Sequence, residues 1–269
     1  MSAKLCYITA IYGDYEKSAK WYPEQTVKAD FICFTDKKDI INNDWILDYT
    51  PYHLTHKSEL DDDQYVNSLS NNMHDCNVAK YYKQQFYRIP RLKQYDIIVW
   101  LDGSVQIYNP RGTEIILKKM TTEKMICFEH HFMYGSLKNE VLESSKMERY
   151  NTTMLYGKPQ PPQNILKQYQ DYLEDGYDEE YFKRYAPNRE HMGVYVTCMV
   201  AFRNDDEEIK EFLDLWYLQT LNHTMADQIG FSYAAQKLNL IPHALPDDDI
   251  KGNYLVSDFH TKCIHGSLP

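Results

Sequence analysis

Two long apolar runs constrain the fold of this chain more than any other feature. They are Ile97–Leu101 and residues 195–202, in which polar side chains do not alternate regularly with apolar ones. Strands of this composition are buried on both faces, as in parallel or mixed sheets that helices cover. Shorter strand-like runs alternate with helical patterns along the rest of the chain, which is typical of an α/β protein. We therefore predict a mixed, mostly parallel sheet flanked by helices.

The order of the expected elements follows from hydrophobic periodicity and from the residues that begin or end helices. We expect strands at residues 5–10, 31–35, 45–49, 96–101, 105–108, 124–128 and 195–202. We expect helices from Asn77 to Pro90 and at residues 110–120, 139–150 and 161–174, followed by two more that Asn204 and Thr224 begin as N-caps. Glu207 and Asp227, each three residues after one of these caps, complete capping-box patterns.

Composition excludes some classes of protein. The formal net charge of −10 argues against a nucleic-acid-binding groove, which needs a basic face. The six cysteines form no C-x-x-C pair, so a structural zinc site is not expected, and those inside apolar runs indicate buried reduced thiols. The 24 tyrosines suit contacts with sugars and bases, although a biased composition explains them equally well. With no signal peptide and no membrane span in the sequence, we expect a cytoplasmic protein.

Asp102 is the leading candidate for chemistry. It directly follows the apolar run Ile97–Leu101, and ligands of α/β sheets bind at the carboxyl ends of strands. This rule brings the residues after Ala10, Thr35, Leu101 and Phe202 into one neighbourhood. A carboxylate there can hold Mn²⁺ or Mg²⁺ together with a substrate diphosphate. Asp102-Gly103 is also a strong hairpin signal, and the two interpretations are compatible.

Other residues near the predicted strand ends are candidates for donor binding. Thr9, Ala10 and Tyr12 lie where the first strand ends and can flank a nucleobase, with Tyr12 stacking on it. Asp36 follows the second strand and can accept hydrogen bonds from a base or ribose, or it is a turn residue. Lys80 and Lys83 share one helix face and can reach a phosphate, or they are solvated.

The second half of the chain holds further polar candidates. His265 can supply an imidazole to a metal and Gly266 lets the backbone approach a phosphate, with His260 as a rival. Asp227 and Gln228 open the last helix, where Asp227 is either a capping residue or a catalytic one. His130 and His131 follow the strand at 124–128, and one of the two can face an acceptor, because neighbouring side chains of a strand point in opposite directions.

Four motifs, in this order, carry a resemblance. They are residues 7–15 (YITAIYGDY), 30–36 (DFICFTD), 79–83 (AKYYK) and 100–104 (WLDGS). Together they resemble the glycosyltransferase-like family whose plant members are linked to mucilage and pectin synthesis, with the pattern Y-T-A-I-x-G-x-Y, F-T-D, A-R-x-x-K and W-x-D-G. The match covers residues 5–108 and extends more weakly to His131, to residues 202–204 and to Asp227-Gln228.

The resemblance implies a GT-A fold, a nucleotide-sugar donor such as a UDP-sugar, and a divalent metal. Asp102, Gly103 and Ser104 then occupy the place of the D-x-D motif, with Ser104 where many relatives have a second acid. Lys80 stands where the family has Arg. The tail resembles that of glycogenin-like retaining galactosyltransferases, in which a late H-x-G segment supplies a metal ligand. That likeness implies metal binding by His265, diphosphate binding by Gly266 and an acceptor-side position for Asp227-Gln228.

We therefore expect one domain over residues 1–269, with a nucleotide-sugar-binding half (1–130) and an acceptor-side half (131–269) whose tail closes the donor site. The expected activity is metal-dependent transfer of a sugar from a UDP-sugar to a glycan or another hydroxyl acceptor. Asp102, Ser104 and His265 would hold Mn²⁺ or Mg²⁺, and His130 or His131 would contact the acceptor. The alternatives are a sugar nucleotidyltransferase and a non-catalytic carbohydrate-binding protein on a transferase fold.

Overall fold

A seven-stranded sheet organises the molecule. The computed structural model describes residues 3–50, 75–155, 157–160, 163–187, 189, 191–245, 248–250, 253–255 and 261–263. The strand order is β10 (His243–Leu245), β6 (Met125–Glu129), β9 (Tyr195–Arg203), β4 (Ile97–Leu101), β1 (Leu5–Ile11), β2 (Asp30–Thr35) and β3 (Ile46–Asp48). Strand β9 runs antiparallel to its neighbours β4 and β6, and the remaining pairs are parallel. The predicted mixed, mostly parallel sheet is confirmed.

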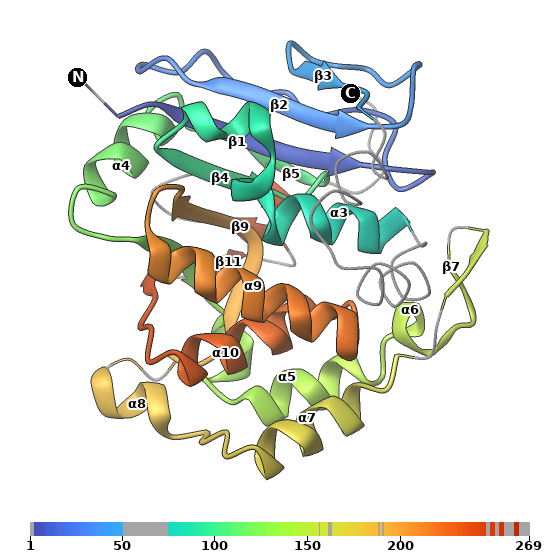
Figure 1. Cartoon of the computed structure of the whole chain (residues 1–269), viewed down its shortest axis with the longest axis vertical. Coiled ribbons are helices and arrows are strands. Elements are labelled where there is room, and N and C mark those ends of the chain that lie inside the picture. Colours follow the sequence, from blue (N-terminus) through green and yellow to red (C-terminus); the bar gives the residue numbers. More distant parts are fainter. Residues whose placement is uncertain are drawn as a thin grey trace.

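Helices cover both faces of this sheet, as the apolar strands require (Figure 1). One face packs against α3 (Asp75–Gln84), α9 (Glu207–Asn222) and α10 (Asp227–Lys237) in a core that includes Ile98 and Trp100. The other face packs against α4 (Gly112–Lys119) in a core that includes Tyr7 and Val99. Successive residues of a strand point to opposite faces, so β4 contributes to both cores.

Residues 131–185 add a smaller layer of short elements. In chain order these are η3 (His131–Met133), α5 (Leu137–Ser144), α6 (Glu148–Asn151), β7 (Met154–Leu155), β8 (Lys158–Pro159), α7 (Ile165–Glu174) and α8 (Tyr181–Tyr185). Helices α5 and α7 pack with α10 around a third apolar cluster, which includes Val141, Tyr172 and Ile229. Figure 1 shows α5 and α7 beyond α10, away from the β1–β3 side of the sheet. Helix α10 therefore joins this layer to the sheet.

The predicted hairpin at Asp102-Gly103 is wrong. Strand β5 (Val105–Ile107) does not pair with β4 but with β13 (Thr261–Cys263), in antiparallel register with Cys263 opposite Val105. The two neighbours of β4 in the sheet are β9 and β1, so no position next to β4 is left for β5. The tail also contains the paired strands β11 (Asp248–Ile250) and β12 (Asn253–Leu255).

The antiparallel course of β9 corrects one expected neighbourhood. Its carboxyl end lies at the opposite edge of the sheet from that of β4, and the backbone amide of Asn204 donates to the carbonyl of Asp96, just before β4 begins. Residues after Phe202 are therefore remote from Asp102. The residues at the start of β9 lie at the Asp102 edge instead.

Both predicted capping boxes are wrong. Helix α9 begins after Asp206, whose carboxylate accepts from two backbone amides, while the side chain of Asn204 donates to the carbonyls of Leu92 and Tyr95. Helix α10 begins at Asp227 after Ala226. The hydroxyl of Thr224 bonds Gln168 and accepts from the amide of Ala226, and Asp227 is free for other contacts.

Two long predicted helices are interrupted. The one from Asn77 ends at Gln84 and continues as two 3₁₀ turns, η1 (Phe86–Arg88) and η2 (Pro90–Gln94). The one at residues 139–150 breaks after Ser144, so α6 is a separate short helix. The predicted buried thiols are confirmed for Cys6, Cys33 and Cys127, but the prediction is wrong for Cys198, which is only partly buried. None of the described helices has the length and apolar character to cross a membrane.

Candidate active site

The candidate site lies where β1, β4 and β6 end and β9 begins. Two cavities open at this edge of the sheet and share Tyr15, Asp102 and Arg149 as lining residues. The smaller cavity has a volume of about 120 Å³ and the larger one of about 830 Å³. The smaller is also lined by Ala10, Tyr12, Ala79, Lys80, Trp100, Gly103, Tyr150, Leu155 and Met225. A ligand in either cavity contacts the same central side chains.

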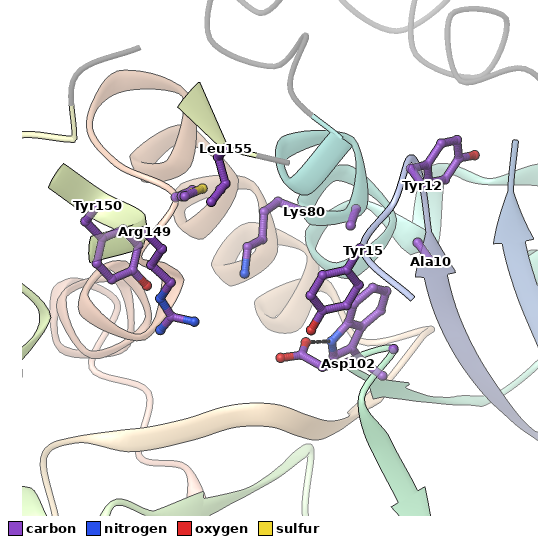
Figure 2. A pocket seen from close by; sticks show the side chains of 12 residues that line it. Ala10, Tyr12, Tyr15, Lys80, Asp102, Arg149, Tyr150 and Leu155 are labelled. Atoms are coloured by element: carbon purple, nitrogen blue, oxygen red, sulfur yellow. Dashed lines mark hydrogen bonds between the residues drawn. The ribbon is translucent and has the colours of Figure 1, made fainter. Parts of the chain in front are cut away.

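Asp102 lines both cavities, and Figure 2 shows it among the residues of the smaller one. Its side chain is 30% exposed. Its Oδ1 accepts a hydrogen bond from the indole Nε1 of Trp100 at 2.6 Å and lies 3.3 Å from the Nζ of Lys83. The Trp100 and Lys83 contacts hold the carboxylate at the rim of the cavities.

Lys83 is the buried centre of the charge network. Its side chain is fully buried, and its Nζ lies 2.6 Å from Asp227 Oδ2 and 3.2 Å from the hydroxyl of Thr197. It also lies 5.7 Å from the centroid of the Trp100 ring. A buried ammonium group needs such partners, because desolvation without them is costly. Lys83 therefore positions the two carboxylates and does not reach a cavity, contrary to the predicted phosphate contact.

Lys80 lies one helical turn before Lys83 and faces the smaller cavity. Its Nζ is 2.9 Å from Asp227 Oδ2, and its side chain is 17% exposed. Burial alone would raise the pKa of Asp227, but the charges of Lys80 and Lys83 outweigh it and hold that pKa well below its usual range. The predicted common face of the two lysines is confirmed by their shared partner Asp227.

Arg149 is a site residue that the sequence analysis missed. It lies on α6, stacks on the Tyr150 ring at 4.7 Å and lines both cavities. Figure 2 shows its guanidinium group opposite Asp102 and Lys80 across the smaller cavity. Its pKa is raised, since nearby Tyr150 and the carboxylates of Asp227 and Asp102 outweigh the opposing effect of burial. No local pattern distinguishes it among the 29 lysines and arginines, because its contacts are long-range.

Gly103 lines the smaller cavity and Ser104 lines the larger one. A Cβ atom at Gly103 would lie 3.0 Å from Ile11 Cγ1 and 3.2 Å from the Tyr15 ring, so close packing favours glycine there. Ser104 is buried, lines the larger cavity and has its hydroxyl 3.5 Å from that of Tyr15. Tyr15 was also missed by the sequence analysis.

The predicted nucleoside contacts separate into two groups. Ala10 and Tyr12 line the smaller cavity, but the Tyr12 hydroxyl donates to that of Tyr82 and points away from Asp102 (Figure 2). Thr9 lies inside β1, because that strand continues to Ile11, and its side chain is buried. Asp36 is exposed at the end of β2, accepts from the amide of Gly13 and lines neither cavity.

The acceptor-side candidates meet in the larger cavity, with one exception. His130, Gln228 and the buried carboxylate of Glu140 line it. The Oε1 atom of Glu140 accepts from the Gln228 amide at 3.0 Å, and Oε2 lies 3.8 Å from His130 Nε2. His131 is exposed, lines neither cavity and lies with its ring centroid 4.4 Å from that of His191. Of the two histidines, His130 is the one that faces the larger cavity.

The described residues supply too few ligands for a divalent ion. Across the described part of the chain, no three side chains of His, Cys, Asp or Glu form a group that could hold a metal. Asp102 is the one acid of the W-L-D-G-S segment, and its Oδ1 is already bonded. His265 and Gly266 lie outside the described residues, as does His260. Strand β13 nevertheless brings the tail to Val105, one residue after Ser104.

The chain is similar to known proteins in structure but not detectably in sequence. Neither a family model nor a curated protein matches the chain. Mouse xyloside xylosyltransferase 1 in its apo form aligns over 90% of this chain and 84% of its own, with a TM-score of 0.47 and 7% identity. Core-mannan synthase A of Aspergillus fumigatus in an Mn/GDP form aligns over 93% and 75%, with a TM-score of 0.43 and 8% identity. The mannosyltransferase Ktr4p of S. cerevisiae aligns over 86% and 62%, with a TM-score of 0.35 and 12% identity.

Proposed function

We propose that this chain is a glycosyltransferase that moves a sugar from a nucleotide-sugar donor, a UDP-sugar in the first instance, to a hydroxyl acceptor. The observation that carries the proposal is the charge cluster at the carboxyl edge of the sheet. Lys80 and Arg149 face one small cavity beside Asp102, and a larger cavity meets it there. Three of the four ordered sequence motifs, which the resemblance assigns to glycosyltransferases, contribute Ala10, Tyr12, Lys80, Asp102 and Gly103 to that cavity, whereas residues 30–36 contribute none.

The charged groups at the smaller cavity suit the diphosphate of the donor, and its volume of about 120 Å³ requires the rest of a UDP-sugar to extend beyond it. Arg149 and Lys80 are charged donors that can bind the two phosphates, and hydrogen bonds between ionised groups are stronger than neutral ones. The apolar wall near Ala10 and Tyr12 suits the nucleoside. The positive charges of Arg149 and Lys80 would stabilise the diphosphate as it leaves with the electron pair of the broken bond between the sugar and the phosphate.

Asp227 fits a stabilising role better than that of a general base. A general base works best when its pKa lies near the working pH, and the pKa of Asp227 is strongly lowered by the two lysines. Its ion pairs instead fix Lys80 at the edge of the smaller cavity. Gln228, which opens into the larger cavity next to Asp227, remains a candidate for contact with the reacting sugar.

Binding of a divalent metal would require a further ligand from the C-terminal tail. Asp102 and Ser104 alone do not complete a site for Mn²⁺ or Mg²⁺, which prefer several oxygen ligands. His265 follows Cys263 by two residues, and the paired backbone of Cys263 and Val105 lies next to the Asp102 segment. We propose His265 as the further ligand.

Calorimetric titration with UDP, GDP and UDP-sugars, each with Mn²⁺ and with EDTA, tests the proposal. We expect the wild type to bind a nucleoside diphosphate, and Arg149→Ala to weaken binding at least tenfold, since a hydrogen bond to a charged group contributes about 1.5–3 kcal/mol. Arg184→Ala is the matched control, because this exposed arginine of α8 pairs with Asp178 and lines neither cavity. No binding of any nucleoside diphosphate by the wild type would refute the proposal.

The same titration, repeated with two histidine variants, shows which histidine binds the metal. If His265 binds the ion, His265→Ala abolishes the gain in UDP affinity that Mn²⁺ gives, and His260→Ala leaves it intact. The reverse result would assign the ion to His260. Equal UDP binding in Mn²⁺ and in EDTA would show that the cations alone hold the diphosphate.

A further inference from the structure

The larger cavity is lined by many residues that do not belong to the proposed donor site. Beyond the shared residues it is lined by Ser104, His130, Phe132, Met133, Tyr134, Asn139, Glu140, Leu142, Glu143, Lys146, Met147, Val196, Cys198 and Gln228. Its volume of about 830 Å³ lies in the range of sites for small organic ligands. Because Asp102 and Arg149 line both cavities, a ligand here can present an atom directly to the donor.

Two exposed aromatic side chains form one wall of this cavity. Phe132 is 50% exposed and Tyr134 is 56% exposed, although large apolar rings are usually covered. The backbone holds them there at a cost, because Tyr134 has a left-handed conformation with a φ of 49°. Gly135 follows with a φ of 67°, and a Cβ atom at Gly193 would lie 2.4 Å from the Gly135 carbonyl oxygen. The segment is therefore held by close backbone packing.

A second part of the lining is polar and comes from α5 and the turn after it. Asn139 and Glu143 lie one turn apart on the same side of α5, and Lys146 follows the end of this helix. The Lys146 Nζ is 2.6 Å from Glu143 Oε1. Leu142 and Met147 also line the cavity. This part of the lining thus combines hydrogen-bonding groups with apolar patches.

Buried polar groups also line the cavity. Glu140 is buried, and its Oε1 accepts from the Ser144 hydroxyl at 2.9 Å and from the Gln228 amide at 3.0 Å. An ionised carboxylate only accepts hydrogen bonds, so the Gln228 NH₂ group has to face Glu140. The Gln228 carbonyl oxygen is then directed elsewhere and can accept from a ligand.

We propose that the larger cavity is the acceptor subsite and that its acceptor is a saccharide of two or three units. One sugar ring lies with its C–H face on Tyr134 or Phe132, and its hydroxyls bond Asn139, Glu143 and Lys146. The acceptor hydroxyl points to the Asp102 and Gln228 end. This inference rests on the proposed function, and it adds the class of acceptor and the residues that select it.

The alternation of apolar and polar groups favours a saccharide over an apolar acceptor. A lipid chain or an aryl alcohol would leave the groups around Glu143 and Glu140 without new partners, at a cost for each polar group that loses water. A sugar offers one apolar face and a ring of hydroxyls, which matches the two parts of the lining. An aromatic side chain with a polar tip, such as Tyr134, suits this mixed surface.

Saturation-transfer difference NMR with a panel of free disaccharides and trisaccharides tests the subsite without needing the donor. We expect transfer to the ring C–H protons of at least one saccharide, and a loss of at least fivefold in the transfer for Phe132→Ala and Tyr134→Asn. Asparagine tolerates a left-handed backbone, so Tyr134→Asn removes the ring and keeps the turn. Tyr185→Ala, at another exposed tyrosine (59%) outside both cavities, should keep the wild-type transfer.

Two outcomes would overturn the inference. One is an absence of transfer to every saccharide of the panel, or transfer that the two ring variants leave unchanged. The other is found with 4-nitrophenyl glycosides, if saturation reaches only the aryl group. Titration of UDP under the same conditions keeps the proposals apart, because UDP binding with no saccharide binding overturns the acceptor subsite alone. Saccharide binding with no nucleotide binding contradicts the transferase and favours a carbohydrate-binding protein.

Discussion

Asp227 is the residue on which the charge network depends. It pairs with the fully buried Lys83 and with Lys80. Asp227→Asn leaves the Lys83 ammonium with Asp102 as its one acidic partner among the described residues. Because the removal of one partner strands a buried charge, we expect a loss of unfolding free energy on the order of 3 kcal/mol, measured by urea denaturation.

Asp214→Asn is the matched control for this substitution. Asp214 also pairs with a cation, Arg88, but its side chain is 44% exposed. Exposed pairs contribute less than about 1 kcal/mol, so the control should be nearly as stable as the wild type. Equal losses for the two variants would show that Asp227 is no more important than a surface ion pair.

The same ion pairs predict a dependence on pH. Folding lowers the pKa of Asp227, so its carboxylate stabilises the folded state only while it is ionised. The contribution is complete above the unfolded pKa, about 3.9, and is lost as the pH falls below it towards the lower folded value. The gap in unfolding free energy between wild type and Asp227→Asn should therefore narrow from pH 6 to pH 3. A gap that stays constant or widens on acidification contradicts the assignment.

At the scale of single residues, the sequence predicted which side chains lie near the site better than it predicted the groups that those side chains contact. The position of Asp102 followed from the strand before it, and Lys80 and Lys83 followed from helical spacing. That Lys83 is buried, and that both lysines bind Asp227, depends on how α3 packs against α10 across more than 140 residues of chain. Arg149 was missed for the same reason, since its contacts with the site exist only after α6 is placed.

Gly193 controls the turn that carries the exposed rings. Its φ is 130°, and a Cβ atom there would lie 2.4 Å from the Gly135 carbonyl oxygen. Gly193→Ala has to displace the segment at Gly135, so we expect a loss of at least 2 kcal/mol, on the order of an overpacked core, together with weaker saccharide binding. Thermal and urea denaturation measure the first effect, and saturation-transfer NMR measures the second.

Gly176→Ala is the control for backbone strain alone. Gly176 also has a positive φ, of 89°, but no atom lies within 4 Å of the added methyl group. It should lose about 1–2 kcal/mol, the cost of a left-handed residue with a side chain. If Gly193→Ala is no worse than Gly176→Ala, the turn at Gly135 adjusts easily and the packing argument fails.

Strands were easier to predict than the short elements between them. The apolar runs at Ile97–Leu101 and in β9 predicted burial on both faces, and both lie in the centre of the sheet. The breaks between α5 and α6 have no strong signal, because tertiary contacts override helix propensity there. The hairpin at Asp102-Gly103 failed because the choice of strand partner is a long-range decision, and β5 pairs with the tail.

At the scale of the whole molecule, a strongly acidic chain concentrates several cations at one edge of its sheet. The net charge is −10, but Lys80, Lys83 and Arg149 gather at one edge of the sheet from α3 and α6. The edge follows from topology, since β1, β4 and β6 are parallel and end together. The order of strands in the sequence predicted this edge. The antiparallel direction of β9 depends on long-range strand pairing and was not predicted.

Ligand binding at this edge should stabilise the entire fold. The site joins β1, β4, α3, α6 and the start of α10, so a diphosphate that binds there binds only the folded chain. At a UDP concentration of 100 times Kd we expect unfolding free energy to rise by about 2.7 kcal/mol. For a chain of this size that corresponds to an increase in Tm of roughly 5–10 °C, measured by differential scanning calorimetry.

Uridine and Arg149→Ala identify the part of the ligand that is responsible. Uridine has the base and ribose but no diphosphate, so it should shift Tm much less than UDP if the cations supply the binding energy. Arg149→Ala should reduce the UDP shift and leave the smaller uridine shift unchanged. Equal shifts for uridine and UDP would place the recognition in the apolar wall at Ala10 and Tyr12, and the charge cluster would then be a structural feature of the sheet edge.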